Sequence, residues 1–289
     1  MLFHHALAEQ PAQHGADQNR RYSRNETAVV DGRKQRIDVG GILAAGEKGK
    51  LAKDLVSTLY AVIERVMAFI IALSPIGVFT MMAWVVATQG PEILGSLAVV
   101  LGCAYLGYIV HAVLCYSFSA KAFAGISPFT FFEKASPAMI FAFTSTSSAA
   151  TIPLSKECAD ELGAESDVSS FVIPLGATIN MDGTAIYQCV ATIFLATCCG
   201  MTLTLGQMVT IVVTATLASI GTAGTPGAGM IMLAMVLEAM NIPVDMIMII
   251  YGIDRLFGMG RTCLNITGDI SCACCVTEWE SKKAAQTAK

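Results

Sequence analysis

Charged side chains are scarce in this sequence. Only 14% of the 289 residues are Asp, Glu, Lys or Arg, against about 25% in an ordinary soluble domain. The longest stretch without any of them runs from Gly183 to Leu237, and others cover 66–91, 93–120 and 135–155. A membrane-spanning helix needs about 20 mainly apolar residues, whereas a soluble core helix keeps a polar face that these stretches lack. The sequence therefore predicts an all-α membrane protein.

Signatures of other protein classes are also missing. The net charge of −4 gives no reason to expect a nucleic-acid partner. Most of the 10 cysteines lie inside apolar segments, where a free thiol behaves as a small hydrophobe rather than as a metal ligand. A hydrolase would need a nucleophile beside a general base, and no such pair presents itself. We therefore expect neither an enzyme nor a bound organic cofactor.

The chain divides by composition into four regions. They are a polar leader at 1–38, which we expect to be disordered, a region with one transmembrane helix at 39–91, a core region at 92–277 and a polar tail at 278–289. The first predicted apolar helix runs from Leu55 to Thr88, the second from Ile93 to Ala120, and the last from Val244 to Val276. Three further apolar segments lie between the second and the last helix.

Each of these three segments is interrupted in its middle. The interruptions read Thr-Ser-Thr-Ser-Ser at 144–148, Asn-Met-Asp-Gly-Thr at 180–184, and a Gly- and Pro-rich run at 219–229. Irregular backbone at membrane depth is tolerated only where protein or a water-filled cavity satisfies its polar groups. Freed N–H groups suit a carboxylate, and freed carbonyls suit a dehydrated cation. The pattern predicts a binding site built from two re-entrant helical hairpins and a discontinuous helix.

The lysines favour the same topology. If every segment crossed the membrane once, Lys121 and Lys156 would lie on opposite faces. If the Ser-rich and Gly/Pro-rich segments return to their own side, every basic cluster faces the cytoplasm. We therefore expect a multi-pass protein of the plasma (inner) membrane with a cytoplasmic carboxyl terminus.

Four motifs follow one another between about residues 40 and 276. They are Ser147-Ser148 in the Ser/Thr tip, Asn180 to Thr184, Gly224 to Gly229, and Gly260-Arg261-Thr262 followed by Asn265 to Asp269. Together they resemble the dicarboxylate/amino acid:cation symporter family, the glutamate transporter homologues. The resemblance implies a secondary active symporter that imports C4-dicarboxylates or acidic amino acids by alternating access, using a sodium or proton gradient.

The resemblance also concerns assembly. Family members work as homotrimers in the lipid bilayer and have further amino-terminal helices. We expect this chain to lack those helices and to be inactive on its own. A neutral amino-acid symporter of the same family is the alternative.

The resemblance implies a set of solute contacts between the two hairpin tips. These positions are Ser147, Ser148, Met181, Thr184, Thr225, Gly229, Arg261, Thr262 and Asn265. It also implies ligands for three sodium ions. They are Gly176, Asn180, Asn265 and Asp269 for one, Thr178, Ser219, Ile220 and Thr222 for a second, and Asn180 and Asp182 for a third. The spacing of these residues agrees with this assignment, because Arg261, Asn265 and Asp269 are four apart and share a helix face. The charges of Arg261 and Asp269 point the same way, because charged residues at bilayer depth are usually functional.

Some of these residues have a structural alternative. Arg261 could serve only as an ion-pair partner of Asp254, and Asp182 could serve only to hydrogen-bond the unwound backbone around Gly183. The Ser/Thr run could be a set of small helix-packing residues. We interpret His111 as a packed helix residue rather than a proton relay.

Two positions depart from the amino-acid carriers of this family. Gly258 stands three residues before Arg261, where those carriers place an Asp that meets the substrate ammonium. Thr146 stands where some members place an arginine. With Asp254-Arg255 nearby, the small residue at 258 resembles the members that carry C4-dicarboxylates.

Overall fold

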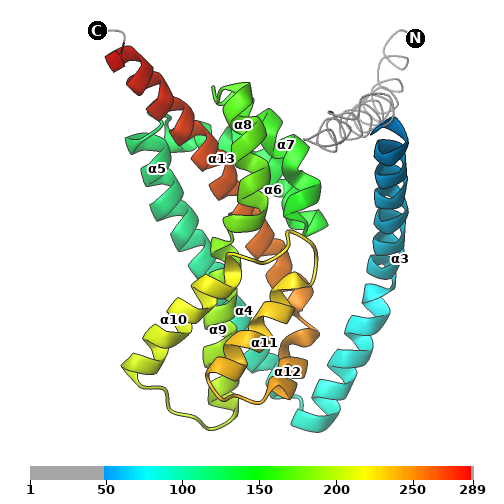
Figure 1. Ribbon diagram of the computed structural model, residues 1–289. Helices are drawn as coiled ribbons and strands as arrows, with labels where there is room; N and C mark the ends of the chain where they lie inside the picture. Colours follow the sequence, from blue (N-terminus) through cyan, green and yellow to red (C-terminus); the bar gives the residue numbers. More distant parts are fainter. Residues whose placement is uncertain (1–48, 288–289) are drawn as a thin grey trace, which may run out of the picture. The chain divides into compact units, whose positions relative to one another are not determined.

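The computed structural model of the protein describes residues 49–287 (Figure 1). The predicted leader, residues 1–38, lies outside the described residues. The helices are α3 (Gly49–Gln89), α4 (Ile93–His111), the π-helix η2 (Ala112–Tyr116), α5 (Ser117–Ala122), α6 (Pro128–Ser145), α7 (Ser148–Glu161), α8 (Ser166–Ile179), α9 (Asp182–Cys198), α10 (Leu205–Ser219), α11 (Ala228–Ala239), the 3-10 helix η3 (Val244–Met246), α12 (Ile247–Tyr251) and α13 (Asp254–Thr287). The described residues contain no strand, which confirms the all-α prediction.

The described chain divides into two units, with the boundary inside α3 between Ser74 and Pro75. The described part of the first unit is the helix at 49–74, and the second unit contains the end of α3 and all the other helices. Within the described residues, the helical stretch Ile93–Ala122 is long and apolar enough to cross a membrane. It covers the predicted second span and contains the π-helix η2. The predicted boundaries between the four regions stay predictions.

The Ser/Thr run forms the turn between two helices that pack against each other, α6 and α7. Thr146 ends α6 in the left-handed conformation with φ 54°, and its N–H donates to the Ala142 carbonyl. Ser147 caps α7, because its Oγ accepts from the N–H of Ala150 at 3.2 Å. Ser at an N-cap satisfies a donor that would otherwise have no partner. The hydroxyls of this run therefore have a local structural use.

The Gly/Pro-rich run joins a second pair of packed helices, α10 and α11, through residues 220–227. A capping box of Thr204 and Gln207 starts α10, and Gly227 starts α11 with φ 83°, which favours glycine. Between the two hairpins, α8 and α9 are interrupted at Asn180 and Met181, as the discontinuous helix requires. The re-entrant placement of the hairpins in a bilayer stays a prediction.

The last predicted helix, Val244 to Val276, is wrong as a single helix. The chain there forms η3, α12 and α13, and the break falls at Gly252 and Ile253. A Cβ on Gly252 would overlap the side chain of Met82. This close approach comes from α3, so it cannot be seen in the apolar pattern of the segment itself. At its other end α13 continues through the predicted tail to Thr287.

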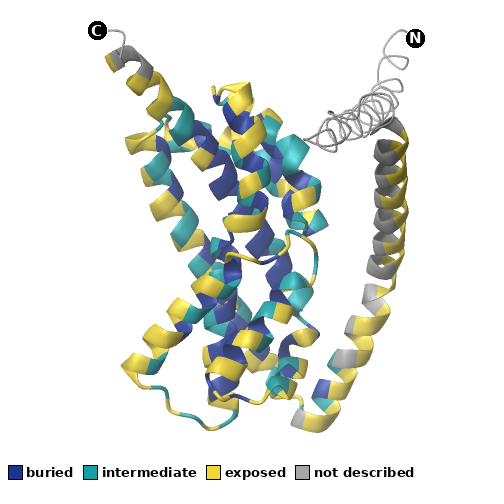
Figure 2. Cartoon of the chain, in the orientation of Figure 1, coloured by how far each residue is buried: buried dark blue, intermediate teal, exposed yellow. Residues whose placement is uncertain are grey.

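The core of the second unit lies around α13, which packs against α4, α6, α7, α8 and α9. Figure 2 shows buried residues along α13 and α9, with exposed residues on the outer faces of α4 and α10. Many of those exposed side chains are large and apolar, such as Leu106, Ile109, Val209 and Leu217. Apolar outer faces of this kind are what a lipid environment accepts.

Candidate solute and cation site

A pocket lies where the two hairpin tips, the break between α8 and α9, and the middle of α13 meet. It is lined by Thr146, Ser148, Met181, Thr184, Thr222, Ala223, Gly224, Thr225, Gly229, Arg261, Thr262 and Asn265. All predicted solute contacts except Ser147 line this pocket. The structure thus brings together residues that lie up to 117 positions apart in the sequence, and their contact with a solute stays a prediction.

Ser147 joins the two hairpin tips instead of lining the pocket. Its hydroxyl donates to the Gly224 carbonyl at 3.0 Å, and the N–H of Ala149 donates to the same carbonyl at 3.1 Å. A Cβ on Gly224 would lie 2.7 Å from the carbonyl oxygen of Ala177, so only glycine allows this approach. The tips are therefore held together by main-chain carbonyls and small residues.

Arg261 carries the only charge among the described residues that line the pocket. Its side chain is buried, its guanidinium lies over the Tyr187 ring at 4.8 Å, and Nη1 is 3.6 Å from Oδ1 of Asp254. That ion pair is too long for a hydrogen bond, and Nη1 has no hydrogen-bond partner among the described residues. Asp254 therefore balances the charge of Arg261 without using up its donors.

The start of α9 docks on α13 beside Arg261. The N–H of Gly183 donates to Oδ1 of Asn265 at 2.8 Å, and Nδ2 of Asn265 faces Thr184 Oγ1 at 3.4 Å. A Cβ on Gly183 would lie 2.5 Å from the carbonyl oxygen of Arg261. The glycine lets two helices meet backbone to backbone at the edge of the pocket.

The first predicted sodium set forms one buried cluster. Nδ2 of Asn180 donates to the Asn265 carbonyl and to Oδ1 of Asp269, both at 3.0 Å. A Cβ on Gly176 would overlap the Asp269 carboxylate. Asp269 is 1% exposed, and its Oδ2 has no hydrogen-bond partner among the described residues. A buried carboxylate is costly unless it is paired or binds a metal ion. The free carboxylate oxygen of Asp269 therefore fits a cation.

The second predicted set lies around the contact between the end of α8 and the loop after α10. Ser219 and Thr222 are buried, whereas Thr178 and Ile220 are exposed. The hydroxyls of Thr178 and Ser219 donate to carbonyls of their own helices, those of Leu175 and Thr216. The second sodium set stays a prediction.

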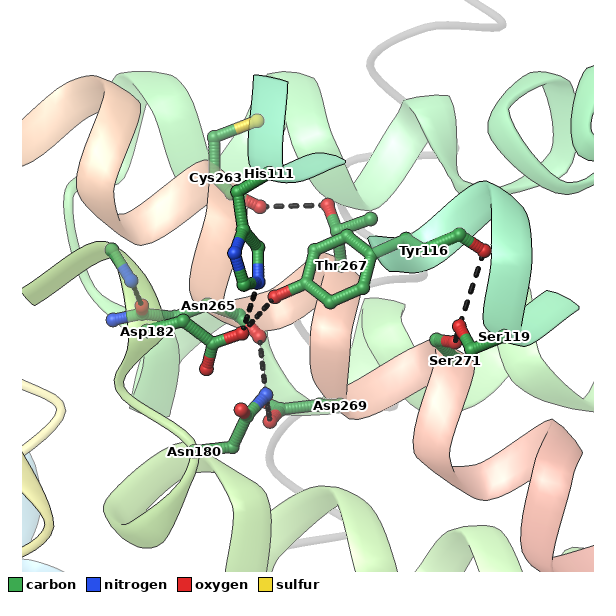
Figure 3. A network of polar contacts seen from close by, with 11 residues as sticks. His111, Tyr116, Ser119, Asn180, Asp182, Cys263, Asn265, Thr267, Asp269 and Ser271 are labelled. Carbon is green, nitrogen blue, oxygen red and sulfur yellow. Dashed lines mark hydrogen bonds and ion pairs between the residues drawn. The ribbon is translucent and has the colours of Figure 1, made fainter. Parts of the chain in front are cut away.

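The third predicted set contains the carboxylate of Asp182, which begins α9. Its Oδ2 lies 2.8 Å from Nε2 of His111 and 2.6 Å from the hydroxyl of Tyr116 (Figure 3). Our interpretation of His111 as a packing residue misses this contact, because the sequence does not reveal which distant residue a helix faces. The alternative for Asp182, a bond to the backbone around Gly183, does not describe its main contacts.

Comparison with known proteins decides the family. A family model described as the sodium:dicarboxylate symporter family matches residues 40–279. The chain belongs to this family. It is 37% identical over 231 residues to a putative sodium-dependent excitatory amino acid transporter, glt-4, of Caenorhabditis elegans, covering 78% of this chain and 46% of that protein.

Two mammalian relatives have slightly lower identity to this chain. Identity is 34% to excitatory amino acid transporter 3 of Mus musculus, which covers 78% of this chain and 43% of that protein. It is 35% to excitatory amino acid transporter 2 of Homo sapiens, which covers 78% and 40%. The chain thus spans less than half the length of these relatives.

Four residues that line the pocket were not predicted as solute contacts, namely Thr146, Thr222, Ala223 and Gly224, of which Thr222 was predicted only as a sodium ligand. They lie within the interrupted segments, so the interruption is the signal that could have identified them. Arg255 was also missed as a structural residue. It donates from Nη1 to Thr146 Oγ1 at 2.6 Å and from Nη2 to the Thr144 carbonyl at 3.1 Å, which ties the first hairpin tip to α13.

Proposed function

We propose that this chain is the solute-binding part of a symporter that uses a sodium gradient to import small acidic solutes. The observation that carries the proposal is Arg261, a buried guanidinium on the pocket wall with a nitrogen that lacks a hydrogen-bond partner among the described residues. A guanidinium of this kind pairs with a carboxylate through two parallel hydrogen bonds. A neutral amino acid has one carboxylate, whereas an acidic amino acid or a C4-dicarboxylate has a second one for which this guanidinium is suited.

The proposal includes the mode of transport. A pocket between two hairpin tips becomes accessible when one tip moves away, which is the simplest physical basis for alternating access. We place the protein in the plasma (inner) membrane as a multi-pass protein with a cytoplasmic carboxyl terminus, assembled as a homotrimer. The apolar outer faces of α4 and α10 support the lipid contact.

Two observations bear on the solute class, and they favour different acids. Among the described residues that line it there is no carboxylate to meet an ammonium group, which favours a C4-dicarboxylate. The named relatives are excitatory amino acid transporters, which favours an acidic amino acid. Binding of radiolabelled succinate and aspartate to the purified chain in lipid nanodiscs, in sodium and in choline buffers, tests both. Sodium-independent binding, or binding of neither acid, would contradict the proposal.

The coupling cation is tested at Asp269. Asp269→Asn keeps the shape of the side chain but removes the charge that faces the cation. We expect the sodium concentration for half-maximal solute binding to rise by at least about tenfold, because an uncompensated change at a buried charge pair costs several kcal/mol. The matched control is Asp245→Asn at an exposed position, and equal sodium dependence in wild type and Asp269→Asn would exclude this role.

The solute class is tested at Gly258. A Cβ there would lie 3.6 Å from Nη2 of Arg261 and 3.7 Å from Thr146, so a larger side chain fits without overlap. Gly258→Asp places a carboxylate beside the guanidinium, where it repels a second solute carboxylate and attracts an ammonium. We expect the ratio of succinate to aspartate affinity to fall by about tenfold. Gly258→Asn is the control of equal size, and a similar fall in that variant would attribute the effect to volume.

A further inference from the structure

The contacts of Asp182 depend on a local change in helix geometry. In an α-helix, residues five apart point about 140° away from each other. In a π-helix the hydrogen bonds run between residues five apart, so such residues lie one above the other. The π-helix η2 covers Ala112–Tyr116, directly after His111. It therefore brings His111 and Tyr116 to the same face, where their rings meet edge to face with centroids 5.2 Å apart.

Both side chains reach the same oxygen of one carboxylate. His111 Nε2 and the Tyr116 hydroxyl lie 2.8 Å and 2.6 Å from Oδ2 of Asp182. An ionised carboxylate only accepts hydrogen bonds, so both partners donate, and Nε2 is the protonated ring nitrogen. Two donors from different directions fix the rotation of the carboxylate about its own axis. They occupy Oδ2 and leave Oδ1 for another partner.

Gly268 of α13 lies against η2 at the same place. A Cβ on Gly268 would lie 2.6 Å from the Tyr116 hydroxyl and would overlap the Asn180 amide. Asn180 in turn donates to Asp269, so the pair on α4 and η2 is continuous with the buried cation cluster (Figure 3). Orientation of Asp182 is therefore set from a helix that contributes no residue to the solute pocket or to the predicted sodium ligands.

We infer that His111 and Tyr116 are positioning residues that orient the Asp182 carboxylate for a coupling cation. The inference rests on the proposed function, because it needs Asp182 to face a bound cation. Hydrogen bonds donated to a cation-binding carboxylate keep it in the orientation that binding requires. Without them the carboxylate rotates freely, and part of the binding free energy is lost to ordering it.

The test compares sodium binding in four variants of the chain in nanodiscs, measured as the sodium concentration that gives half of the sodium-dependent rise in melting temperature. Tyr116→Phe and His111→Phe each remove one donor to a charged acceptor, so we expect that concentration to rise about three- to tenfold in each. His111→Gln retains an N–H donor and should lie closer to wild type. Tyr105→Phe is the matched control, because its hydroxyl also binds α13, through the Leu256 carbonyl at 2.8 Å, but lies outside this network.

The melting temperature without sodium separates positioning from stability. A merely structural role would lower that temperature in Tyr116→Phe and leave the half-saturating sodium concentration unchanged, and this result would overturn the inference alone. A wild-type chain whose melting temperature does not respond to sodium would contradict the proposed function and the inference with it. A rise in Tyr116→Phe and His111→Phe, with Tyr105→Phe at the wild-type value, would support the positioning role.

Discussion

Replacement of Arg261 by lysine is expected to lower the affinity for a C4-dicarboxylate by about ten- to a hundredfold, because hydrogen bonds to charged groups contribute about 1.5–3 kcal/mol. An ammonium cannot match the two parallel hydrogen bonds of a guanidinium. It would also lose the flat contact with the Tyr187 ring. Equilibrium binding of radiolabelled succinate at saturating sodium measures the change.

Sodium binding should respond far less in this variant, because Arg261 lies outside the predicted ligand sets. The matched control is Arg65→Lys, at an exposed position of α3 outside the pocket. Unchanged succinate affinity in Arg261→Lys would show that the guanidinium does not bind the solute carboxylate. An equal loss of sodium affinity would instead point to a general distortion of α13.

The interruptions in the apolar segments identify the three segments that line the pocket. A Ser/Thr run, an Asn-Met-Asp-Gly-Thr break and a Gly/Pro run are costly at membrane depth unless something satisfies their backbone, and the structure places all three at one pocket. The four-residue spacing of Arg261, Asn265 and Asp269 on one helix also follows from helix geometry. These are local properties, which a sequence expresses directly.

Contacts between distant segments could not be predicted in the same way. Ser147 lies one position before Ser148, yet it faces the second hairpin tip, because the left-handed turn at Thr146 sets the direction of the chain. The pairing of His111 with Asp182 depends on the π-helix. The apolar pattern of residues 112–116 does not distinguish a π-helix from an α-helix. The break at Gly252 likewise depends on Met82 from another helix.

Several glycines at the pocket lie so close to another segment that a side chain there would overlap it. Gly183, Gly224 and Gly229 each lie where a Cβ would meet another segment at 2.7 Å or less. At Gly229 that neighbour is the flexible end of Arg261, which can move. At Gly183 it is the main chain of α13, which cannot move without disturbing the helix. The cost of a methyl group should therefore be largest at Gly183.

Gly183→Ala is expected to destabilise the protein by about 1–3 kcal/mol, as overpacked cores do. The new Cβ would lie 2.5 Å from the carbonyl oxygen and 2.9 Å from the Cα of Arg261. Relief requires α9 to move away from α13, which lengthens the 2.8 Å bond from the Gly183 N–H to Asn265. The melting temperature in nanodiscs should fall by several degrees, and succinate affinity should fall with it because the start of α9 lines the pocket.

The control variant is not expected to lower the melting temperature. Gly102 lies in the middle of α4, and a Cβ there meets nothing within 4 Å. Alanine is a better helix former than glycine by about 0.5–1 kcal/mol, so Gly102→Ala should leave the melting temperature unchanged or raise it. The higher helix propensity of alanine also favours Gly183→Ala. A lower melting temperature in that variant therefore means that the steric cost exceeds the gain in helix propensity. A stable, solute-binding Gly183→Ala variant would mean that α9 and α13 do not approach each other as closely as this structure has them.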